Sequence, residues 1–459
     1  MKRVNSHLTL LVSAIMLSGL FHTAPVLAAG CPTPTFEVAH TLETAHGITF
    51  IEAADFNGDG KSDLVLVNEQ DESVSIFIGG GDGAFQPALS HRAGPGSISL
   101  STADFNRDGK FDLCVANYGS TNVSLFMGNG DGTFQTPVNY DVGSNPLSTA
   151  TADFNRDGKL DLAVANHFSG NVSVLLGNGD GTFRSAVNYG AGQRAASVAT
   201  GDFDSDGRTD LAVAHDFIYV SILSGAGDGT FQFAGRHNVG WNPRFVIVDD
   251  FNEDGRQDLA VANAGVPPDY TNSTVSVLLG VGDGTFDNAV NHEAGPHARR
   301  VSSGDFNADG KRDLVTANFF RSSRDISIVA GNGDGTFRPA VHQYATGGGS
   351  LSVATSDFNR DGRPDLAVAS ELPDEISDSV SVLLNTCASA AVDVSIVGRN
   401  NNVTISWPFP STGFVLESTT NLSPPNWQPA VEVPATNNGR FEVSVSLNQV
   451  ERYFRLRKP

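Results

Sequence analysis

A ten-residue segment rich in side-chain oxygens recurs seven times along the chain. It has the form Asp-Phe-Asn-x-Asp-Gly-x-x-Asp-Leu, with at most one substitution per copy. Carboxylate or amide oxygens fall at positions 1, 3, 5 and 9, the backbone carbonyl of position 7 adds another oxygen, and glycine at position 6 permits a sharp bend. Hard oxygen ligands at this density suit Ca²⁺, so we expect up to seven structural calcium ions. The expected ligands are Asp55, Asn57, Asp59, Lys61 and Asp63; Asp104, Asn106, Asp108, Lys110 and Asp112; Asp153, Asn155, Asp157, Lys159 and Asp161; Asp202, Asp204, Asp206, Arg208 and Asp210; Asp250, Asn252, Asp254, Arg256 and Asp258; Asp305, Asn307, Asp309, Lys311 and Asp313; and Asp357, Asn359, Asp361, Arg363 and Asp365.

Two other interpretations of these segments are weighed against calcium binding. An EF-hand places a bidentate Glu at position 12, where this chain has apolar residues such as Leu66, Val115 and Val164. Asp, Asn and Gly also form good turns without any metal. Seven copies with the same four oxygen positions favour calcium, because convergent carboxylates repel one another unless a cation lies between them.

The overall charge agrees with this interpretation. The chain has 51 Asp and Glu against 29 Lys and Arg, a formal net charge of −22. At positions 1, 3, 5 and 9, six of the loops have three carboxylates and the loop at Asp202 has four, so these positions alone hold 22 carboxylates. Nucleic acid is excluded as a partner, because phosphate binding requires clusters of basic residues.

The spacing of the loops predicts a ring of β-sheets. Successive loops begin 49, 49, 49, 48, 55 and 52 residues apart. A period of this length, made of short apolar runs and Gly-rich turns, is typical of a β-propeller with one four-stranded blade per repeat. In the second repeat the expected strands are 98–105, 113–117, 123–127 and 134–140. We therefore expect an all-β fold with a seven-bladed β-propeller over residues 29–387.

The two ends of the repeat region complement each other. The last repeat stops after its third strand, whereas residues 35–40 align with a fourth strand, so we expect an N-terminal strand to close the last blade. This closure brings Cys31 near Cys387. Export permits the disulfide that we expect between them, and two unpaired thiols are the alternative. Cys114 lies in an apolar strand and is expected to be buried.

Both termini lie outside the predicted propeller. Residues 1–28 have the basic start, apolar run and small-residue cleavage site of a signal peptide, so we expect a secreted or cell-surface protein with no membrane span in the mature chain. Residues 388–391 are typical of a short linker. Residues 392–459 alternate apolar and polar side chains in several runs, which predicts a small C-terminal β-sandwich-like domain.

The Asp-rich loop, together with Val-Ser-Val-Leu-Leu-Gly-Asn-Gly-Asp-Gly-Thr-Phe, resembles the FG-GAP or VCBS repeat family over residues 35–386. This resemblance implies a propeller similar to that of integrin α subunits, in which such loops bind Ca²⁺ between the first and second strands of a blade. It implies calcium ligands at Asp55, Asn57, Asp59, Asp63 and the matching positions of the other six repeats.

A ligand is expected on the face opposite the calcium loops, which collects the loops between strands two and three and between blades. Exposed aromatic and Arg residues on loops of a rigid scaffold are common binding anchors. We expect a monomeric binding or adhesion module for an extracellular carbohydrate or a surface protein, and ordinary solvated loops are the alternative. The candidate ligand residues are Tyr118, Phe168, Trp241, Arg244, Arg299, Arg300, Phe319 and Phe320.

The sequence contains no recognisable catalytic motif. It has no Gly-x-Ser-x-Gly elbow, no His-Glu-x-x-His and no phosphate-binding loop, and its paired carboxylates are assigned to metal. We therefore expect no enzyme activity. The alternative is a polysaccharide-degrading enzyme, a lyase or hydrolase, on the same calcium-stabilised scaffold.

Overall fold

The computed structural model describes residues 23–27, 31, 33–320, 323–343, 348–371 and 378–387, and the segments 391–399, 402–408, 415–419, 428–429, 435–437, 440–446 and 453–457. Every helix or strand assigned to these residues is a β-strand, as predicted. Within the same residues we find no helix with the length and apolar character needed to cross a membrane.

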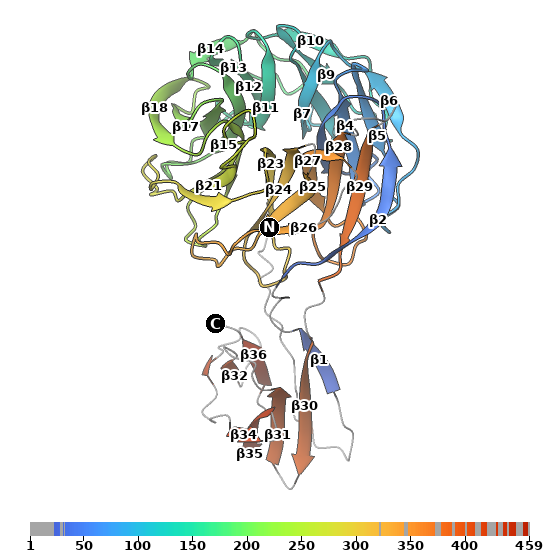
Figure 1. Cartoon of the computed structure of the whole chain (residues 1–459), viewed down its shortest axis with the longest axis vertical. Coiled ribbons are helices and arrows are strands. Elements are labelled where there is room, and N and C mark those ends of the chain that lie inside the picture. The colour runs from blue at the N-terminus through green and yellow to red at the C-terminus, as the bar shows by residue number, and fades with distance from the viewer. Residues whose placement is uncertain are drawn as a thin grey trace. The chain divides into compact units, whose positions relative to one another are not determined.

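Seven four-stranded antiparallel sheets form the blades of a closed ring (Figure 1). The first, innermost strand of each blade contacts the first strand of the next blade, and β27 contacts β3, so the seven-bladed propeller is confirmed. The inner strands are β3 Ile48–Ala54, β7 Ser97–Ala103, β11 Pro146–Ala152, β15 Ala195–Gly201, β19 Pro243–Asp249, β23 Ala298–Gly304 and β27 Gly349–Ser356.

The remaining strands of each blade follow outward in chain order. The second strands are β4 Asp63–Asn68, β8 Asp112–Asn117, β12 Asp161–Asn166, β16 Asp210–His215, β20 Asp258–Asn263, β24 Asp313–Phe320 and β28 Asp365–Glu371. The third strands are β5 Ser73–Phe77, β9 Asn122–Phe126, β13 Asn171–Leu175, β17 Tyr219–Gly225, β21 Thr274–Leu278, β25 Ser323–Val329 and β29 Ser379–Asn385. The outer strands are β6 Leu89–Arg92, β10 Val138–Asp141, β14 Val187–Gly190, β18 Phe231–Asn238, β22 Val290–Glu293, β26 Val341–Gln343 and, in the last blade, β2 Phe36–Glu43.

The last blade takes its outer strand from the N-terminal part of the chain. β2 pairs antiparallel with β29 along its length, which confirms the predicted closure of the ring. Cys31 lies just before β2 and Cys387 lies just after β29, and the two form a disulfide with their Cα atoms 5.8 Å apart. Cys114 is fully buried.

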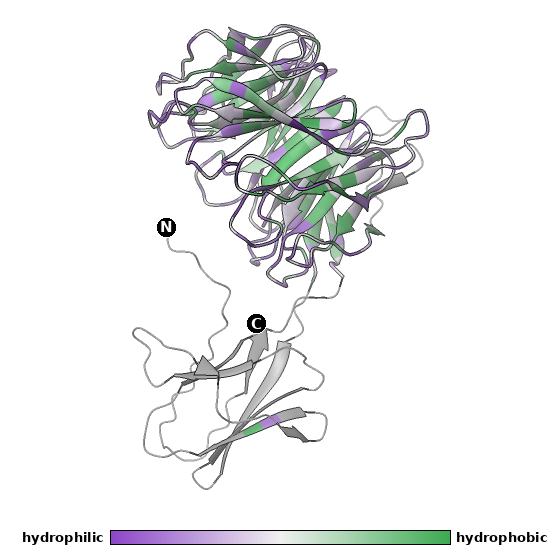
Figure 2. Cartoon of the chain, turned by 90° about the vertical axis from the view of Figure 1, so that its left-hand side faces the viewer, coloured by the Kyte–Doolittle hydropathy of each residue, from purple (hydrophilic) through white to green (hydrophobic). Residues whose placement is uncertain are grey.

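The core lies between the blades, where one pair of phenylalanine rings recurs at each junction. The ring at position 2 of each Asp-rich loop contacts a phenylalanine ring of the next blade, with centroids 5.3 to 6.1 Å apart in a T-shaped arrangement. In six junctions this second ring follows a Gly-rich loop, and in the seventh it is Phe36 at the start of β2. Figure 2 shows hydrophobic residues concentrated in the blade strands and hydrophilic residues in the loops. The pairs are Phe56–Phe134, Phe105–Phe183, Phe154–Phe231, Phe203–Phe286, Phe251–Phe337, Phe306–Phe36 and Phe358–Phe85.

The outer strand of the second blade begins later than the sequence predicted. It spans Val138–Asp141 in place of 134–140, and Phe134 forms an isolated bridge with Gly128. The strand is interrupted at residues 135–137, which separate this bridge from Val138. In the fourth blade the outer strand does begin at the equivalent residue, Phe231.

Further strands lie outside the propeller. In one sheet β1 Thr23–Leu27 pairs with β30 Ala391–Arg399, which pairs with β31 Asn402–Pro408, followed by β35 Arg440–Ser446 and β34 Ala435–Asn437. In another, β32 Val415–Thr419 lies between β33 Gln428–Pro429 and β36 Tyr453–Arg457. The sandwich-like domain over 392–459 stays a prediction. The predicted leader 1–28, apart from β1, and the predicted linker 388–391, apart from the start of β30, lie outside the described residues.

Candidate metal loops and channel-mouth pocket

Backbone hydrogen bonds fold each Asp-rich loop around its predicted ligand side chains. In the third blade the two Asp153 carboxylate oxygens accept the N–H groups of Asp157 at 3.1 Å and Gly158 at 2.8 Å. Asn155 Oδ1 also accepts the Asp157 N–H at 3.0 Å, and Asp157 Oδ1 accepts the Lys159 N–H at 3.0 Å. The same bonds recur in the first, second, fourth, fifth and seventh loops. The loop therefore keeps its shape through its own amides.

The fourth loop gathers the oxygens that a divalent cation needs. Carboxylate oxygens of Asp202, Asp204 and Asp210 all lie within 4.8 Å of one another. Burial raises the pKa of Asp210, and the nearby Asp204 and Asp206 raise it further. A cation among these oxygens would offset the repulsion, so the donor set fits Ca²⁺.

The Asp at position 9 also has a structural role that the sequence did not reveal. In the third blade Asp161 is fully buried and accepts the N–H groups of Phe154 at 2.9 Å and Gly177 at 2.7 Å. The first bond closes the Asp-rich loop, and the second ties it to the Gly-rich loop after the third strand. The equivalent residues make the same two bonds to backbone N–H groups, and they are Asp63, Asp112, Asp210, Asp258, Asp313 and Asp365.

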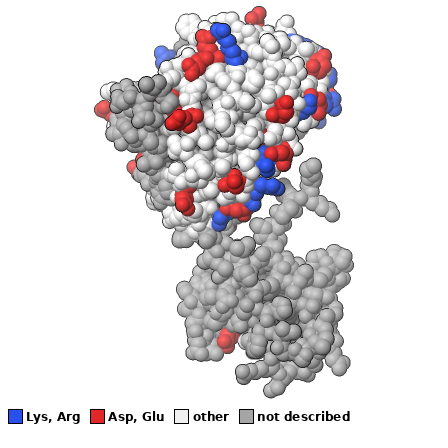
Figure 3. Space-filling model, turned by 90° about the vertical axis from the view of Figure 1, so that its right-hand side faces the viewer, with Lys and Arg blue, Asp and Glu red and all other residues white. Residues whose placement is uncertain are grey.

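The basic side chain at position 7 pairs with the Asp at position 5 of its own loop. Lys61 Nζ lies 3.2 Å from Asp59 Oδ2, and Lys159 Nζ lies 3.3 Å from Asp157 Oδ2. Figure 3 shows basic and acidic residues side by side on one flank of the propeller. Exposed pairs of this kind contribute at most about 1 kcal/mol. Metal binding by the position 7 carbonyl stays a prediction.

On the opposite face, every inner strand contains a β-bulge at the same position. The pairing register shifts, for example, between Ile48 and Phe50 in β3 and between Ala195 and Ser197 in β15. A bulge leaves one residue unpaired and redirects its side chain. The seven bulge residues, which all line one pocket, are Thr49, Ile98, Leu147, Ala196, Arg244, Arg299 and Leu351.

A second set of equivalent residues, the rim set, lies within one residue of the end of the second strand of each blade. In six blades the backbone N–H of this residue donates a hydrogen bond to the backbone carbonyl of the residue just before the inner strand. In the first blade, for example, the Glu69 N–H donates to the Gly47 carbonyl at 2.7 Å. Side chains of the set connect neighbouring blades. Asp216 contacts His167 Nε2 at 2.9 Å and accepts the Arg244 Nη1–H at 3.2 Å. The rim set is Glu69, Tyr118, His167, Asp216, Ala264, Phe319 and Glu371.

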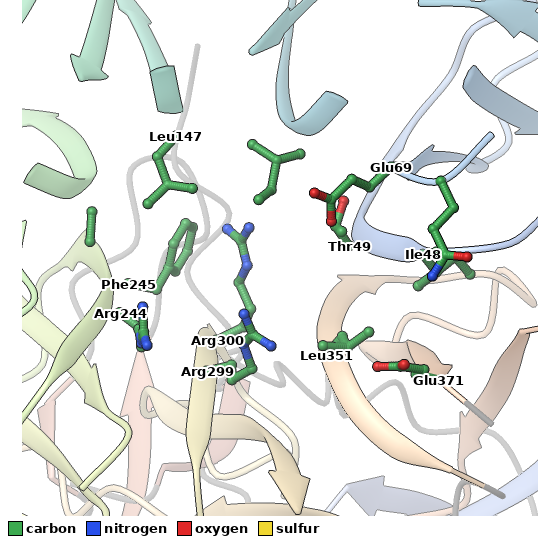
Figure 4. Close-up of a pocket in the computed structure, with 14 residues that line it drawn as sticks. Ile48, Thr49, Glu69, Leu147, Arg244, Phe245, Arg299, Arg300, Leu351 and Glu371 are labelled. Atoms are coloured by element: carbon green, nitrogen blue, oxygen red, sulfur yellow. The ribbon is translucent and has the colours of Figure 1, made fainter. Parts of the chain in front are cut away.

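The bulge residues and two members of the rim set enclose a pocket of about 220 Å³ at one mouth of the propeller channel (Figure 4). All seven blades contribute to its lining. In Figure 4 the Arg299 and Arg300 side chains extend between Phe245 on one side and Glu69 and Leu351 on the other. The pocket thus combines apolar, cationic and anionic walls.

The pocket arginines differ in their partners. Arg244 is paired with Asp216. Within the described part of the chain, by contrast, no carboxylate oxygen lies within 4.0 Å of a side-chain nitrogen of Arg299 or Arg300. The Arg300 guanidinium carbon lies over the Phe50 ring, 4.2 Å from its centroid, and over the Phe245 ring, 4.4 Å from its centroid, so the cation contacts two aromatic rings. Among the described residues, the two guanidinium groups therefore have no acid within ion-pair distance, although Glu52 acts on Arg300 through space.

Burial alters the ionisation of groups in and behind the pocket. Burial and the neighbouring Arg244 lower the pKa of Arg299 to about 10, and burial and Arg299 lower the pKa of Arg300 to about 9. Both therefore stay charged at neutral pH. Glu52, further along β3, accepts the Thr102 hydroxyl at 2.6 Å, and burial raises its pKa to about 7.

Three of the predicted ligand residues, Arg244, Arg299 and Arg300, come together in this pocket. Sequence analysis missed the acidic lining residues Glu69 and Glu371. An alignment of the seven repeats could have found them. In that alignment Glu69 and Glu371 occupy a position that differs from repeat to repeat and holds charged, aromatic or aliphatic side chains, whereas the Asp-rich loops hardly vary.

The other predicted ligand residues are not among those that line the pocket. Phe319 lies 5.2 Å from the Arg299 guanidinium carbon, and the Tyr118 ring lies 6.0 Å from that of His167. Phe168 and Trp241 are 82% and 57% exposed and do not line the pocket. The side chain of Phe320 lies outside the described part of the structure.

Comparisons with known proteins identify the repeat. The family model described as FG-GAP-like repeat matches residues 55–115, 104–164, 153–213, 204–261, 250–316 and 305–368. No curated protein matches the chain.

Solved structures are similar in fold at low sequence identity. BBS1N in complex with ARL6DN, from a crystal soaked with mercury, is 13% identical with a TM-score of 0.53, and the match covers 76% of this chain and 96% of that one. The same complex soaked with lead gives a TM-score of 0.52, with the same identity and coverage. An Agrocybe aegerita lectin, solved for its recognition of non-reducing terminal N-acetylglucosamine, is 21% identical with a TM-score of 0.46, over 66% of this chain and 80% of the lectin.

The repeat matches cover more than half of the chain, and each runs from one Asp-rich loop through the second strand of the next blade. This agrees with the observed blade order. The protein therefore belongs to the family of proteins built from FG-GAP-like repeats.

Proposed function

We propose that this propeller is an exported, calcium-stabilised binding module whose ligand is an extracellular carbohydrate or a surface protein. The observation that carries the proposal is the pocket at the channel mouth, which all seven blades line with different side chains at equivalent positions. The Asp-rich loops of the other face repeat almost unchanged. Stability explains a face that is uniform from blade to blade, whereas a face that differs in each blade and encloses a cavity is suited to recognition.

Calcium would be held by the side chains at positions 1, 3, 5 and 9 and the carbonyl at position 7 of each loop. Its charge would offset the repulsion among the loop carboxylates. Extracellular calcium modules have dissociation constants of roughly 10⁻⁴ to 10⁻³ M, so each site would add roughly 0.4 to 1.4 kcal/mol at about 1 mM calcium. Seven such sites would add several kcal/mol in total.

Removal of calcium is therefore expected to lower the melting temperature. The purified protein would be melted in about 1 mM calcium and in excess chelator, because only the folded loops bind the ion. Adding calcium back beyond the chelator is the control and should restore the melting temperature. An unchanged melting temperature, with no calcium found by elemental analysis, would contradict calcium binding.

A glycan and matrix-protein array tests the binding function itself. The calcium-loaded protein is expected to bind an extracellular ligand on the array, and a folded protein that binds nothing would contradict the proposal. A turnover assay on pectin and the bound glycans separates binding from lyase or hydrolase activity, since a binding module returns its ligand unchanged.

A further inference from the structure

We propose that the channel-mouth pocket binds an anionic sugar, the end residue of an acidic polysaccharide that bears one carboxylate or sulfate group and free hydroxyl groups. This inference rests on the proposed function and names the carbohydrate class. Its basis is the arrangement of Arg299 and Arg300 opposite Glu69 and Glu371 within one small cavity.

The first step concerns the unpaired cations. Arg244 shows how an arginine on this face is neutralised when stability is its role, because Asp216 lies at 3.2 Å. Arg299 and Arg300 have no such acid among the described residues. The guanidinium carbon of Arg300 lies over the Phe50 and Phe245 rings, and its N–H groups can donate hydrogen bonds to an oxyanion.

The second step concerns the acids across the cavity. Glu69 and Glu371 line the same pocket and act on Arg299 through space, yet neither is within ion-pair distance of it. The gap between the opposite charges is therefore part of the cavity. An anionic group fits beside the arginines, and carboxylates on the far wall accept hydrogen bonds from hydroxyl groups. A sugar acid presents both on one ring.

The third step concerns size and shape. At about 220 Å³ the cavity is smaller than the roughly 300 to 1,000 Å³ of pockets for drug-sized ligands, so it suits a single sugar residue. Leu147 and Leu351 supply apolar wall for the C–H face of the sugar. Phe245 and Arg300, which also line the pocket, lie one residue further along their inner strands than the bulge residues Arg244 and Arg299. The ligand then enters from the open face as a chain end.

Calorimetric titration of the calcium-loaded protein tests this inference. The probes are D-galacturonate, galactose 6-sulfate, neutral galactose and an acidic dipeptide. Galacturonate or the sulfated sugar is expected to bind at least about tenfold more tightly than galactose, because charge-assisted hydrogen bonds form only with the anion. Arg299→Gln should abolish this preference, whereas the control Arg92→Gln, at an exposed arginine paired only with Glu72, should keep it.

A second variant keeps the test decisive if Arg299→Gln fails to fold. Thr49→Glu places an acid in the same bulge set and should remove anionic-sugar binding by repulsion while melting as the parent does. Equal binding of charged and neutral galactose, or unchanged binding in both folded variants, would overturn the pocket assignment and leave the binding function intact if the arrays are positive. Tighter binding of the dipeptide than of either sugar would overturn the choice of a carbohydrate. Failure of the proposed function would be seen separately, because the folded protein would then bind nothing on the glycan and matrix-protein arrays.

Discussion

At the scale of single residues, a close backbone contact requires glycine at one position in each of six blades. Its N–H donates to the position 9 Asp of the Asp-rich loop, which draws its Cα against the carbonyl oxygen of position 8. A Cβ at this place would lie 2.0 to 2.2 Å from that oxygen, far inside any real contact. These glycines are Gly79, Gly128, Gly177, Gly225, Gly280 and Gly331.

The change Gly177→Ala is therefore expected to lower the free energy of unfolding by roughly 2 to 4 kcal/mol, since the Asp161 bond or the strand must shift to relieve the clash with the Leu160 carbonyl. The matched control is Gly190→Ala in β14, where no atom lies within 4 Å of the added Cβ, and a change within about 0.5 kcal/mol is expected. Urea unfolding measures both. Equal losses in the two variants would show that the contact does not fix the glycine.

The same residues show how far prediction from sequence reaches. The oxygens at positions 1, 3, 5 and 9 lie in one short loop, so their convergence can be inferred from spacing alone. The hydrogen bond from the Gly177 N–H to Asp161 cannot be inferred in this way, because Gly177 lies in another loop, which strand pairing brings close to the Asp-rich loop. For Arg299 and Arg300 the sequence predicts the face, but it does not predict that the Arg300 guanidinium contacts rings from two other blades.

At the scale of elements, a serine in the third strand joins its neighbours within a blade. Ser173 in β13 accepts the Asn166 Nδ2–H of β12 at 2.8 Å and donates to Asn188 Oδ1 of β14 at 2.6 Å. It also accepts a backbone N–H of the preceding inter-blade loop at 3.1 Å. In the fourth blade His215 replaces the asparagine, and the equivalent Ser221 Oγ is buried without a hydrogen-bond partner.

Removing these two hydroxyl groups is expected to have unequal effects. Ser173→Ala should lower the free energy of unfolding by roughly 1 to 3 kcal/mol, because one N–H of the Asn166 amide and the Gly143 backbone N–H lose their acceptor. Ser221→Ala should be neutral or stabilising, because its hydroxyl is already desolvated without a partner. Urea unfolding of both variants gives the comparison, and a larger loss for Ser221→Ala would contradict it.

The elements were predicted better than their irregularities. Apolar runs and turn residues located the first three strands of the second blade to within two residues. The bulges of the inner strands were not predicted, because bulge position depends on how neighbouring blades pack around the channel.

At the scale of the whole molecule, closure of the ring depends on a strand from the opposite end of the sequence. The repeat count and the missing fourth strand made this predictable. Phe36 then completes the junction with Phe306 as its equivalents do at the other six. The disulfide between Cys31 and Cys387 flanks the closing pair of strands in the chain, with a sequence separation of 356. Breaking the disulfide should therefore destabilise the pairing of β2 with β29 more than it destabilises the other blades.

The change Cys31→Ser is expected to lower the free energy of unfolding by roughly 2 to 5 kcal/mol, because a cross-link of this length restricts the unfolded chain. Hydrogen exchange separates the local effect from the global one. Amides of β2 should exchange faster in the variant, while amides of the central strand β12 should change only with global stability.

The buried thiol provides the control for losing a sulfur atom. Cys114→Ala should cost at most about 1 kcal/mol, because equivalent strands of other blades hold Ala163 and Ala212 at this buried position. In the Cys114→Ala variant the amides of β2 should exchange at the same rates as in the parent protein. If Cys31→Ser left β2 exchange unchanged while lowering global stability, the disulfide would act only on the unfolded chain, and pairing with β29 and the Phe36 contact would suffice to hold the ring closed.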